Sequence, residues 1–260
     1  MELILNVSKS GYKPFLNTKI DAFIIAVNDY SEGELYKLSL DKLEDAIKEI
    51  KVANKQIYLK MNILLSETKL DDFRKDLDKY TSLEVDAFVV SDFGVLNIFK
   101  ERNLLERVIF NPETYICNNL SAKFISDLGV KRISLANELE LDEIIEIGNH
   151  VPGKVEVMVE GLPKISTSKR NILSTYFDYY KLNKESDIYY AREENRDSKL
   201  PMFEDEEGLY VYNNVNISRF NDLSKLLENN IKYLRIEGFN KSEVEILELI
   251  NKYKGGEAHE

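Results

Sequence analysis

Thiol and imidazole side chains are scarce in this sequence, which contains one cysteine and two histidines. The single cysteine, Cys117, excludes a disulfide within the chain and any iron–sulfur cluster that several thiolates of one chain would hold. We expect Cys117 to lie in a strand-to-helix turn as an ordinary buried small residue, with no histidine near enough to activate it.

The two histidines leave little material for catalysis by a histidine base. His150 falls at the end of an expected helix, where we interpret it as a solvated residue, and His259 falls near the end of the chain. The sequence has no H-E-x-x-H motif. Because the base that activates a nucleophile is usually histidine, the sequence disfavours nucleophilic catalysis of that kind.

Long apolar runs are also missing. The N-terminus carries an acid, Glu2, at its second position and only a short apolar run, which does not fit a secretory signal peptide. No uncharged apolar segment approaches the roughly 20 residues needed to span a bilayer. We therefore expect a cytoplasmic protein without membrane association.

Positive charge is in deficit. The 46 acidic side chains outnumber the 35 basic ones and give a net charge of −11. Such a charge repels phosphate backbones unless a local basic patch overrides it. Binding of nucleic acid by this chain alone is therefore disfavoured.

What the sequence does have is a regular alternation of strand-like and helix-like segments. Strands recur about every 25 to 35 residues, the length of one βαβ step, and no glycine-rich linker marks a domain boundary. We predict an α/β fold, a TIM-like (β/α) barrel, as a single domain over residues 1–254 with a flexible tail at 255–260. An open doubly wound sheet is the alternative, but it lacks support from any glycine-rich phosphate-binding motif.

The expected elements follow from apolar periodicity. The strands of the barrel are expected at Leu3–Val7, Asp21–Val27, Gln56–Asn62, Asp86–Ser91, Arg107–Asn111, Lys131–Leu135, Val155–Val159 and Lys232–Glu237. The helices are expected at Leu40–Ala53, Lys69–Tyr80, Phe93–Arg102, Leu120–Leu128, Leu141–Gly148, Ser218–Asn229 and Ser242–Tyr253.

The segment after the seventh strand is irregular and could leave the barrel imperfectly closed. A polar, basic loop is expected over Lys164–Asn171, followed by the aromatic patch Tyr176, Phe177, Tyr179 and Tyr180. Beyond it, Ile188–Arg192 and Gly208–Tyr212 are expected to form a hairpin or a strand insertion, and the acidic run 204–207 reads as a solvated turn. Such a basic and aromatic cluster can stack bases and contact phosphates; alternatively the tyrosines pack on the barrel and the lysines are solvated.

Residues just past the strand ends face the active-site mouth of a barrel. The candidates are Asn62, Asp92, Glu113, Glu138 and Glu160. The four carboxylates could surround a divalent cation or bind a cationic ligand. Alternatively they cap the following helices or pair with Lys60, Lys164, Arg170 and Arg235.

Taken together, several segments resemble peptidase family U32, the collagenase-like peptidases, over nearly the whole chain. The segments that carry the resemblance are Asn62-Ile63-Leu64, Val85-Asp86-Ala87 with Ser91-Asp92-Phe93-Gly94, Thr114 with Asn118-Asn119, Leu128–Arg132 before Leu135–Leu139, the strand Val155–Gly161 and the turn Ser168-Lys169-Arg170. The chain is most similar to short, cysteine-poor members, and this likeness includes Tyr176-Phe177 and Pro201–Glu206.

The chain also departs from the family's pattern. Glu160 stands where the signature has a histidine before glycine, and Asn137 stands where arginine is usual before the Glu-Leu pair. Lys164 and Asn171 occupy positions that are cysteine in members with an iron–sulfur cluster. The resemblance therefore implies a member without such a cluster.

What the resemblance implies for function is a part in 5-hydroxylation of the tRNA wobble uridine. It implies prephenate as the related small molecule, a longer U32-family protein as the partner, and tRNA reached through that complex. The expected ligand-binding residues are Asn62, Glu113, Asn119, Lys164, Ser168, Arg170 and Tyr176.

Two further hypotheses stay open, and with them the question whether the chain is an enzyme at all. One is a collagenase-like peptidase or other hydrolase in which Asp92, Glu138 and Glu160 are catalytic, with or without a metal. The other is a small-ligand binding barrel without turnover, in which Lys60, Arg170 or Arg235 would pair with a bound carboxylate, because a buried anion requires a partner.

Overall fold

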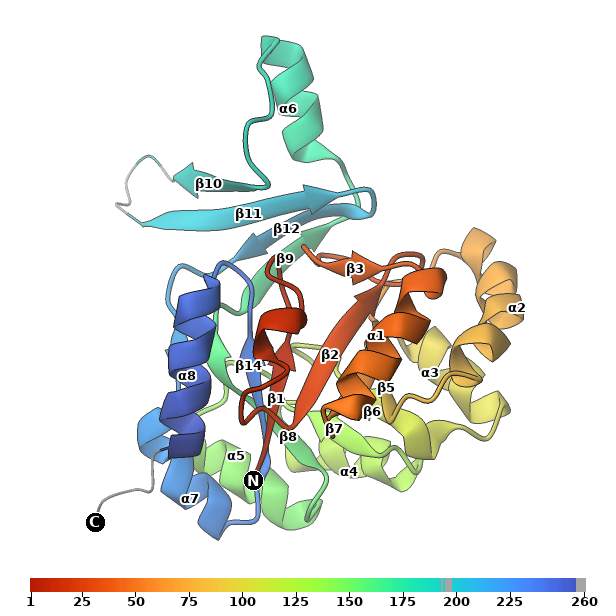
Figure 1. The fold of residues 1–260 in the computed structure, drawn as a ribbon, viewed down its shortest axis with the longest axis vertical. Coiled ribbons are helices and arrows are strands. Elements are labelled where there is room, and N and C mark those ends of the chain that lie inside the picture. The colour runs from red at the N-terminus through yellow and green to blue at the C-terminus, as the bar shows by residue number, and fades with distance from the viewer. Residues whose placement is uncertain (193, 195–197, 256–260) are drawn as a thin grey trace.

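Eight parallel strands form a closed barrel in the computed structural model, which describes residues 1–192, 194 and 198–255 (Figure 1). Each strand pairs with its two neighbours, and the ring closes because β1 pairs with both β14 and β2. In order around the ring the strands are β1 (Glu2–Asn6), β2 (Ala22–Val27), β4 (Gln56–Met61), β5 (Ala87–Val90), β6 (Val108–Phe110), β7 (Arg132–Ser134), β8 (Val155–Gly161) and β14 (Tyr233–Glu237). The TIM-like barrel expected from the sequence is confirmed, and every expected barrel strand is present.

Helices cover the outside of this ring. They are α1 (Leu40–Val52), α2 (Leu70–Thr81), α3 (Phe93–Glu101), α4 (Asn119–Asp127), α5 (Leu141–His150), α7 (Leu223–Glu228) and α8 (Glu243–Gly255). Short 3-10 turns accompany them at η1 (Lys13–Phe15), η2 (Glu67–Lys69), η3 (Leu105–Arg107) and η4 (Phe220–Asp222). Among the described residues, no helix has the length and apolar character that crossing a membrane demands.

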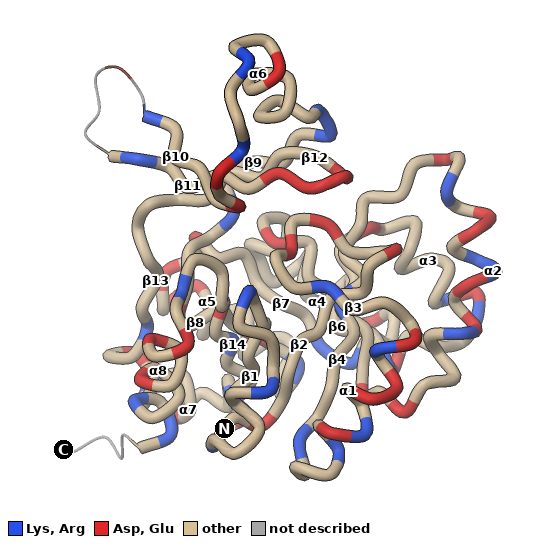
Figure 2. The backbone as a smooth tube through the Cα atoms, turned by 45° about the horizontal axis from the view of Figure 1, so that its top comes forward, with Lys and Arg blue, Asp and Glu red and all other residues tan. Residues whose placement is uncertain are grey.

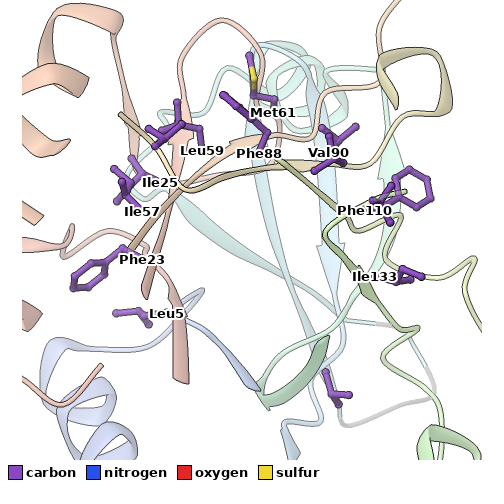
Figure 3. Packing of buried hydrophobic residues seen from close by; sticks show 14 of the residues in the cluster. Leu5, Phe23, Ile25, Ile57, Leu59, Met61, Phe88, Val90, Phe110 and Ile133 are labelled. Atoms are coloured by element: carbon purple, nitrogen blue, oxygen red, sulfur yellow. The ribbon is translucent and has the colours of Figure 1, made fainter. Parts of the chain in front are cut away.

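The main hydrophobic core lies between the ring of strands and these helices. Alternate residues of each strand point outward and pack against apolar helix residues such as Leu43 and Ile47 of α1. Figure 3 shows part of this layer, including Phe23 and Ile25 of β2 and Leu59 of β4. Because successive strand residues face opposite sides, the intervening residues point into the barrel.

The barrel interior is half apolar and half ionic. On one side it is filled by Ile4, Ala22, Ile24, Tyr58, Ala87, Val89 and Ile109. On the side of β7, β8 and β14 the inward residues include Arg132, Glu156 and Arg235, which are at most 2% exposed. Buried charges on three neighbouring strands must be neutralised by each other, and this requirement shapes the mouth described below.

An antiparallel sheet is inserted after β8 and lies over one end of the barrel, as Figure 1 shows. Its strands run in the order β10 (Ile188–Arg192), β11 (Lys199–Asp205), β12 (Gly208–Tyr212) and β9 (Lys164–Ser168), and α6 (Ile172–Tyr180) projects from it. The expected insertion is present. The expectation of a polar loop over Lys164–Asn171 is wrong for its first part, because pairing with β12 makes that part strand β9.

Further local expectations need correction. β10 and β12 do not form a hairpin with each other; β11 lies between them and pairs with both. Within the acidic run, Glu204 and Asp205 have side chains only 3% and 6% exposed, so the run is not simply a solvated turn. Cys117 is exposed rather than buried.

At the C-terminal end, the helix expected over Ser218–Asn229 is split into β13 (Ile217–Ser218), η4 and α7. Gly255, expected to begin the flexible tail, ends α8, and residues 256–260 lie outside the described part of the chain.

Candidate functional site

The mouth of the barrel, where the strands end, contains a small inner cavity of about 40 Å³. A volume of this size holds only a few water molecules. Inward-facing strand-end residues and the insert line it: Asn6, Val7, Ser8, Gly33, Glu34, Leu35, Lys60, Asn111, Glu113, Asn137, Met158, Leu162, Pro163, Lys164, Tyr212, Arg235, Glu237 and Phe239. The conserved geometry of a barrel brings these positions together from every part of the chain.

Three acid–base pairs give this inner cavity balanced charge. Lys60 pairs with Glu34. Arg235 Nε lies 2.9 Å from Glu237 Oε1, and Lys164 Nζ lies 3.1 Å from Glu113 Oε2. The site is therefore polar but carries no surplus of either sign.

The two innermost carboxylates have pKa values shifted in opposite directions. Desolvation raises the pKa of Glu34 above its ordinary value, although the Lys60 ammonium opposes that rise. Burial also acts to raise the pKa of Glu237, but the Arg235 guanidinium and the Lys60 ammonium outweigh it and leave this pKa below its ordinary value. Glu237 is therefore held as a carboxylate by cations on two neighbouring sides.

Two residues that line the inner cavity have a buried amide oxygen without a hydrogen-bond partner among the described residues. Asn6 Nδ2 donates to Glu237 Oε2 at 2.6 Å, which orients the amide and leaves Asn6 Oδ1 unpaired. Asn137 Oδ1, on the loop after β7, is also unpaired, and both residues are at least nine-tenths buried.

A larger outer cavity of about 320 Å³ adjoins the inner one. It is lined by Glu32, Asn62, Leu64, Ser91, Pro112, Glu113, Thr114, Tyr115, Lys164, Ile165, Ser166 and Thr167. Its volume lies within the range of roughly 300 to 1,000 Å³ that small-molecule sites occupy. Glu113 and Lys164 border both cavities.

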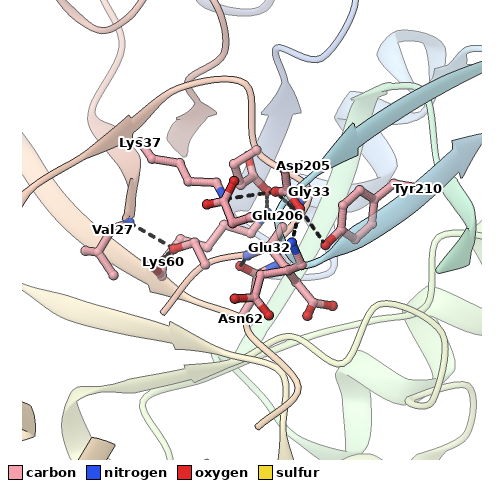
Figure 4. Close-up of polar contacts among 12 residues, drawn as sticks. Val27, Glu32, Gly33, Lys37, Lys60, Asn62, Asp205, Glu206 and Tyr210 are labelled. Atoms are coloured by element: carbon pink, nitrogen blue, oxygen red, sulfur yellow. Dashed lines mark hydrogen bonds and ion pairs between the residues drawn. The ribbon is translucent and has the colours of Figure 1, made fainter. Parts of the chain in front are cut away.

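The segment after β2, which includes the short strand β3 (Lys37–Leu38), ties the barrel to the inserted sheet above the mouth (Figure 4). Gly33 N donates to Asp205 Oδ2 at 3.0 Å, and Lys37 Nζ lies 2.8 Å from the same oxygen. Tyr212 OH donates to Gly33 O at 3.1 Å. These contacts hold the inserted sheet in place over the cavities.

Below the mouth, buried charges continue through the barrel. Arg235 Nη1 lies 3.5 Å from Glu156 Oε1, and Arg132 Nε lies 4.0 Å from Glu156 Oε2. Arg132 Nη1 also pairs with Glu2 Oε1 at 2.7 Å near the opposite end. Burial raises the pKa of Glu156, and the two guanidinium groups act against that rise. These buried ion pairs form a column of charge inside the barrel. They hold the Arg235 side chain in place, and Arg235 in turn holds Glu237.

Three of the expected ligand-binding residues, Asn62, Glu113 and Lys164, line the outer cavity together. The other four lie elsewhere. Asn119 is the first residue of α4 and Ser168 is the last residue of β9, while Arg170 and Tyr176 are exposed on the insert. The sequence therefore predicts the correct end of the barrel, but the expected ligand-binding residues include both cavity residues and surface residues.

The three acids expected to be catalytic occupy three different settings. Asp92 Oδ1 accepts a hydrogen bond from Val95 N and caps α3, as the alternative interpretation stated. Glu138 is exposed after β7, and Glu160 is 4% exposed. The Glu160 carboxylate accepts hydrogen bonds from Ser218 Oγ at 2.9 Å and Tyr253 OH at 3.3 Å, so it faces β13 and α8.

The arrangement of four carboxylates around one cation is not what the fold produces. Glu113 pairs with Lys164, and Asp92 and Glu160 have the partners given above. Within residues 1–192, 194 and 198–255, no group of three or more His, Cys, Asp or Glu residues is placed to hold a metal ion.

Sequence reasoning missed most of the inner cavity. Asn6, Glu34, Asn111 and Glu237 were not expected there, and Lys60 and Arg235 were considered only as ion-pair or anion partners. A usable signal existed in β14, where the polar residues Arg235 and Glu237 alternate with outward apolar ones. Polar side chains on the inward face of a barrel strand near its C-terminal end indicate a site.

The residues present do not fit an iron–sulfur cluster. Such a cluster needs several thiolates, whereas this sequence offers Cys117 alone, exposed in the loop before α4. Lys164, one of the two positions where the resemblance implies a cysteine in members with a cluster, pairs with Glu113.

Comparison with known proteins relates the chain to one family. The family model described as "Peptidase family U32" matches residues 8–256. The chain is 25% identical to "tRNA hydroxylation protein P2" of Bacillus subtilis, over 97% of this chain and 84% of that protein. It is 25% identical to "tRNA hydroxylation protein P" of Escherichia coli over 78% of this chain, but it spans only 55% of that longer protein.

Solved structures agree on the fold. The structure described as "The Structure of the U32 Peptidase Mk0906" has a TM-score of 0.56 at 13% identity, and covers 91% of this chain and 92% of its own. A chitinase from Rhizomucor miehei has a TM-score of 0.52 at 11% identity, with 98% and 99% covered. At such low identity these likenesses establish the barrel and nothing about chemistry.

Proposed function

The chain belongs to peptidase family U32, and we propose that it is an accessory subunit, without an iron–sulfur cluster, in 5-hydroxylation of the tRNA wobble uridine. One observation carries this proposal: the chain is similar to tRNA hydroxylation protein P2 over nearly its whole length, while it has a single cysteine. In this role it acts in the cytoplasm, and a longer U32-family protein supplies the redox chemistry.

The outer cavity supports a role in holding a small carboxylate, for which prephenate is our candidate. The cavity has a suitable volume, and Lys164 supplies a cation at its border with the inner cavity. Lys60 and Arg235, the other candidate anion partners, line the inner cavity but not the outer one. Arg170 borders neither cavity. Lys164 is therefore the residue that we assign to the ligand carboxylate.

The inserted sheet supports a role in contacting the partner. Its helix α6 carries a chain of neighbouring rings: Tyr176 and Tyr180 have centroids 4.8 Å apart, and Tyr179 and Tyr180 have centroids 4.9 Å apart. Tyr176, Tyr179 and Tyr180 are 52%, 78% and 57% exposed. Figure 2 shows few charged residues on α6. Exposed tyrosines with little charge are typical of protein interfaces, so tRNA is expected to be reached through the complex.

A genetic experiment tests this role. The gene is deleted in a strain that lacks redundant paralogues, and wobble 5-hydroxyuridine is measured by nucleoside mass spectrometry. We expect the modification to fall and to return when the wild-type chain is supplied. An unchanged level of 5-hydroxyuridine would reject the proposal.

A hydrolase is the second candidate, because the family is named for peptidases. In that case Asp92, Glu138 and Glu160 are the proposed catalytic acids. The test is digestion of gelatin by purified protein, with and without added divalent metal, and with Glu138→Gln as the control. Equal cleavage by both proteins would assign the activity to a contaminant.

Binding of a small ligand without turnover, the remaining hypothesis, would appear as thermal stabilisation of the protein by prephenate with no product.

A further inference from the structure

The ion pair between Lys164 and Glu113 separates the two cavities of the mouth. Both side chains border the inner cavity of about 40 Å³ and the outer cavity of about 320 Å³. Their charged atoms lie 3.1 Å apart, and the side chains are 12% and 24% exposed. A ligand in the outer cavity therefore meets this pair before it reaches the inner residues.

Glu113 is the acid of the mouth that can move most easily. Its side chain is 24% exposed, against 11% for Glu34 and 15% for Glu237. Its backbone has φ of +64° and is held by a hydrogen bond of 3.2 Å from Glu113 N to Asn111 Oδ1. A non-glycine residue in this left-handed region is strained, a feature that gathers at ligand sites. Because its side chain is already partly exposed, Glu113 can turn toward solvent without a change of its backbone.

The balance of charges at the inner cavity determines which group can replace the Glu113 carboxylate. The inner cavity has three cations and three carboxylates, so an added anion would leave one negative charge unpaired there. An unpaired buried charge costs several kcal/mol. A ligand carboxylate that takes the place of the Glu113 carboxylate beside Lys164 keeps the balance, because one negative charge leaves as another enters.

We propose that the Lys164–Glu113 pair between the two cavities marks a subsite for the carboxylate of a small ligand, and that this carboxylate displaces Glu113 from Lys164. In the unliganded protein, the Glu113 carboxylate occupies the place beside Lys164 that the ligand carboxylate takes when it binds. The choice of prephenate as a probe rests on the proposed function; the subsite itself rests on the two cavities and their shared pair.

Isothermal titration with prephenate, which has two carboxylates and a hydroxyl, tests the exchange. Glu113→Gln removes the competing charge, so we expect it to bind prephenate roughly five- to tenfold more tightly than the wild type. Lys164→Met removes the cation and is expected to bind at least about tenfold more weakly. Glu44→Gln, an exposed residue of α1 with the same change of charge, is the matched control and leaves the affinity unchanged.

An affinity of Glu113→Gln equal to or weaker than that of the wild type would overturn the displacement. If neither the wild type nor Glu113→Gln binds prephenate, the subsite does not exist. The role in tRNA hydroxylation is judged separately from wobble 5-hydroxyuridine in the deletion strain, so the two proposals can fail independently.

Discussion

The ring of Tyr210 lies so close to Gly33 that a Cβ atom at position 33 would come within 3.0 Å of it. Gly33 belongs to the loop after β2, and Tyr210 belongs to β12 of the inserted sheet, so the contact joins the barrel to the inserted sheet. The glycine has φ of +70°, a left-handed conformation that residues with a Cβ rarely adopt. Both the close approach and the backbone angle require glycine here.

Gly33→Ala is therefore expected to lower the free energy of unfolding by about 2 to 4 kcal/mol, from backbone strain plus displacement of the Tyr210 ring. Gly153→Ala is the matched control, because Gly153 has φ of +72° and no atom of the described residues lies within 4 Å of the added Cβ. It should cost only the strain, about 1 to 2 kcal/mol. Urea unfolding of both variants gives the difference, and equal losses would show that the contact with Tyr210 contributes nothing.

Glu204 holds the N-terminus of α6 on the inserted sheet. Its carboxylate accepts hydrogen bonds from Leu173 N at 2.7 Å and from Ser174 N at 2.9 Å, and also from the Ser174 hydroxyl. Glu204→Gln weakens these bonds and should raise the rate of amide hydrogen exchange over residues 172–180. Glu185→Gln, an exposed change in the same insert, is the control. Unaltered exchange in Glu204→Gln would contradict this role.

The same contact predicts a pH dependence. Burial acts to raise the pKa of Glu204, but the hydrogen bonds from Ser174 and Leu173 outweigh it and leave this pKa below its ordinary value. The stabilisation is therefore present above the unfolded pKa of about 4.3 and is lost as the pH falls through the lower folded pKa. We expect α6 amides to lose protection below about pH 4 in the wild type. In Glu204→Gln the protection should be lower and independent of pH across this range.

The exposed rings of α6 predict a loss of partner contact without a loss of fold. Tyr179→Ser, at a side chain that is 78% exposed, should leave the melting temperature within about 2 °C of the wild type. It should still reduce rescue of wobble 5-hydroxyuridine in the deletion strain. Phe124→Ser on α4, where the side chain is 64% exposed, is the control for removal of a surface ring. Equal rescue by the two variants would place the partner elsewhere.

Arg132 neutralises the column of buried charge. It is 2% exposed, it lies over the rings of Tyr58 and Tyr233 at 4.7 and 4.3 Å, and it faces Glu156. Arg132→Met removes the cation, so we expect a loss of about 3 to 5 kcal/mol at neutral pH.

The loss should depend on pH. Without Arg132 the raised pKa of Glu156 rises further, and a buried acid of raised pKa favours the folded state below its unfolded pKa and loses that advantage as the pH rises through the folded pKa. Arg132→Met should therefore be closer to the wild type in stability at pH 5 than at pH 8, as measured by urea unfolding. The double variant Arg132→Met, Glu156→Gln should lose this difference; if it persists, another group is responsible.

Much of the architecture was open to prediction from the sequence. Runs such as Ala22–Val27 and Ala87–Val90 are apolar throughout, and they alternate with helices whose apolar residues recur at helical spacing, as in α1. These signals depend on neighbours a few residues apart. For the same local reason the cap at Asp92 could be foreseen, because its partner Val95 is three residues away.

The insert was harder to predict, because its short, partly exposed strands carry weak periodicity. Residues 164–168 are largely exposed and polar, so only pairing with β12 identifies them as a strand. Likewise Glu204 looks like a solvated acid until α6 folds back over it.

The sequence by itself determined the alternation of strands and helices, the lack of thiolates for a cluster, and the membership of a family. Only the tertiary structure decided which charges meet. Asn6 contacts Glu237, Arg132 contacts Glu2 and Lys164 contacts Glu113 across long stretches of chain. Apolar periodicity is local, whereas the partner of a buried charge is set by the closure of the barrel, which brings the ends of distant strands to one mouth.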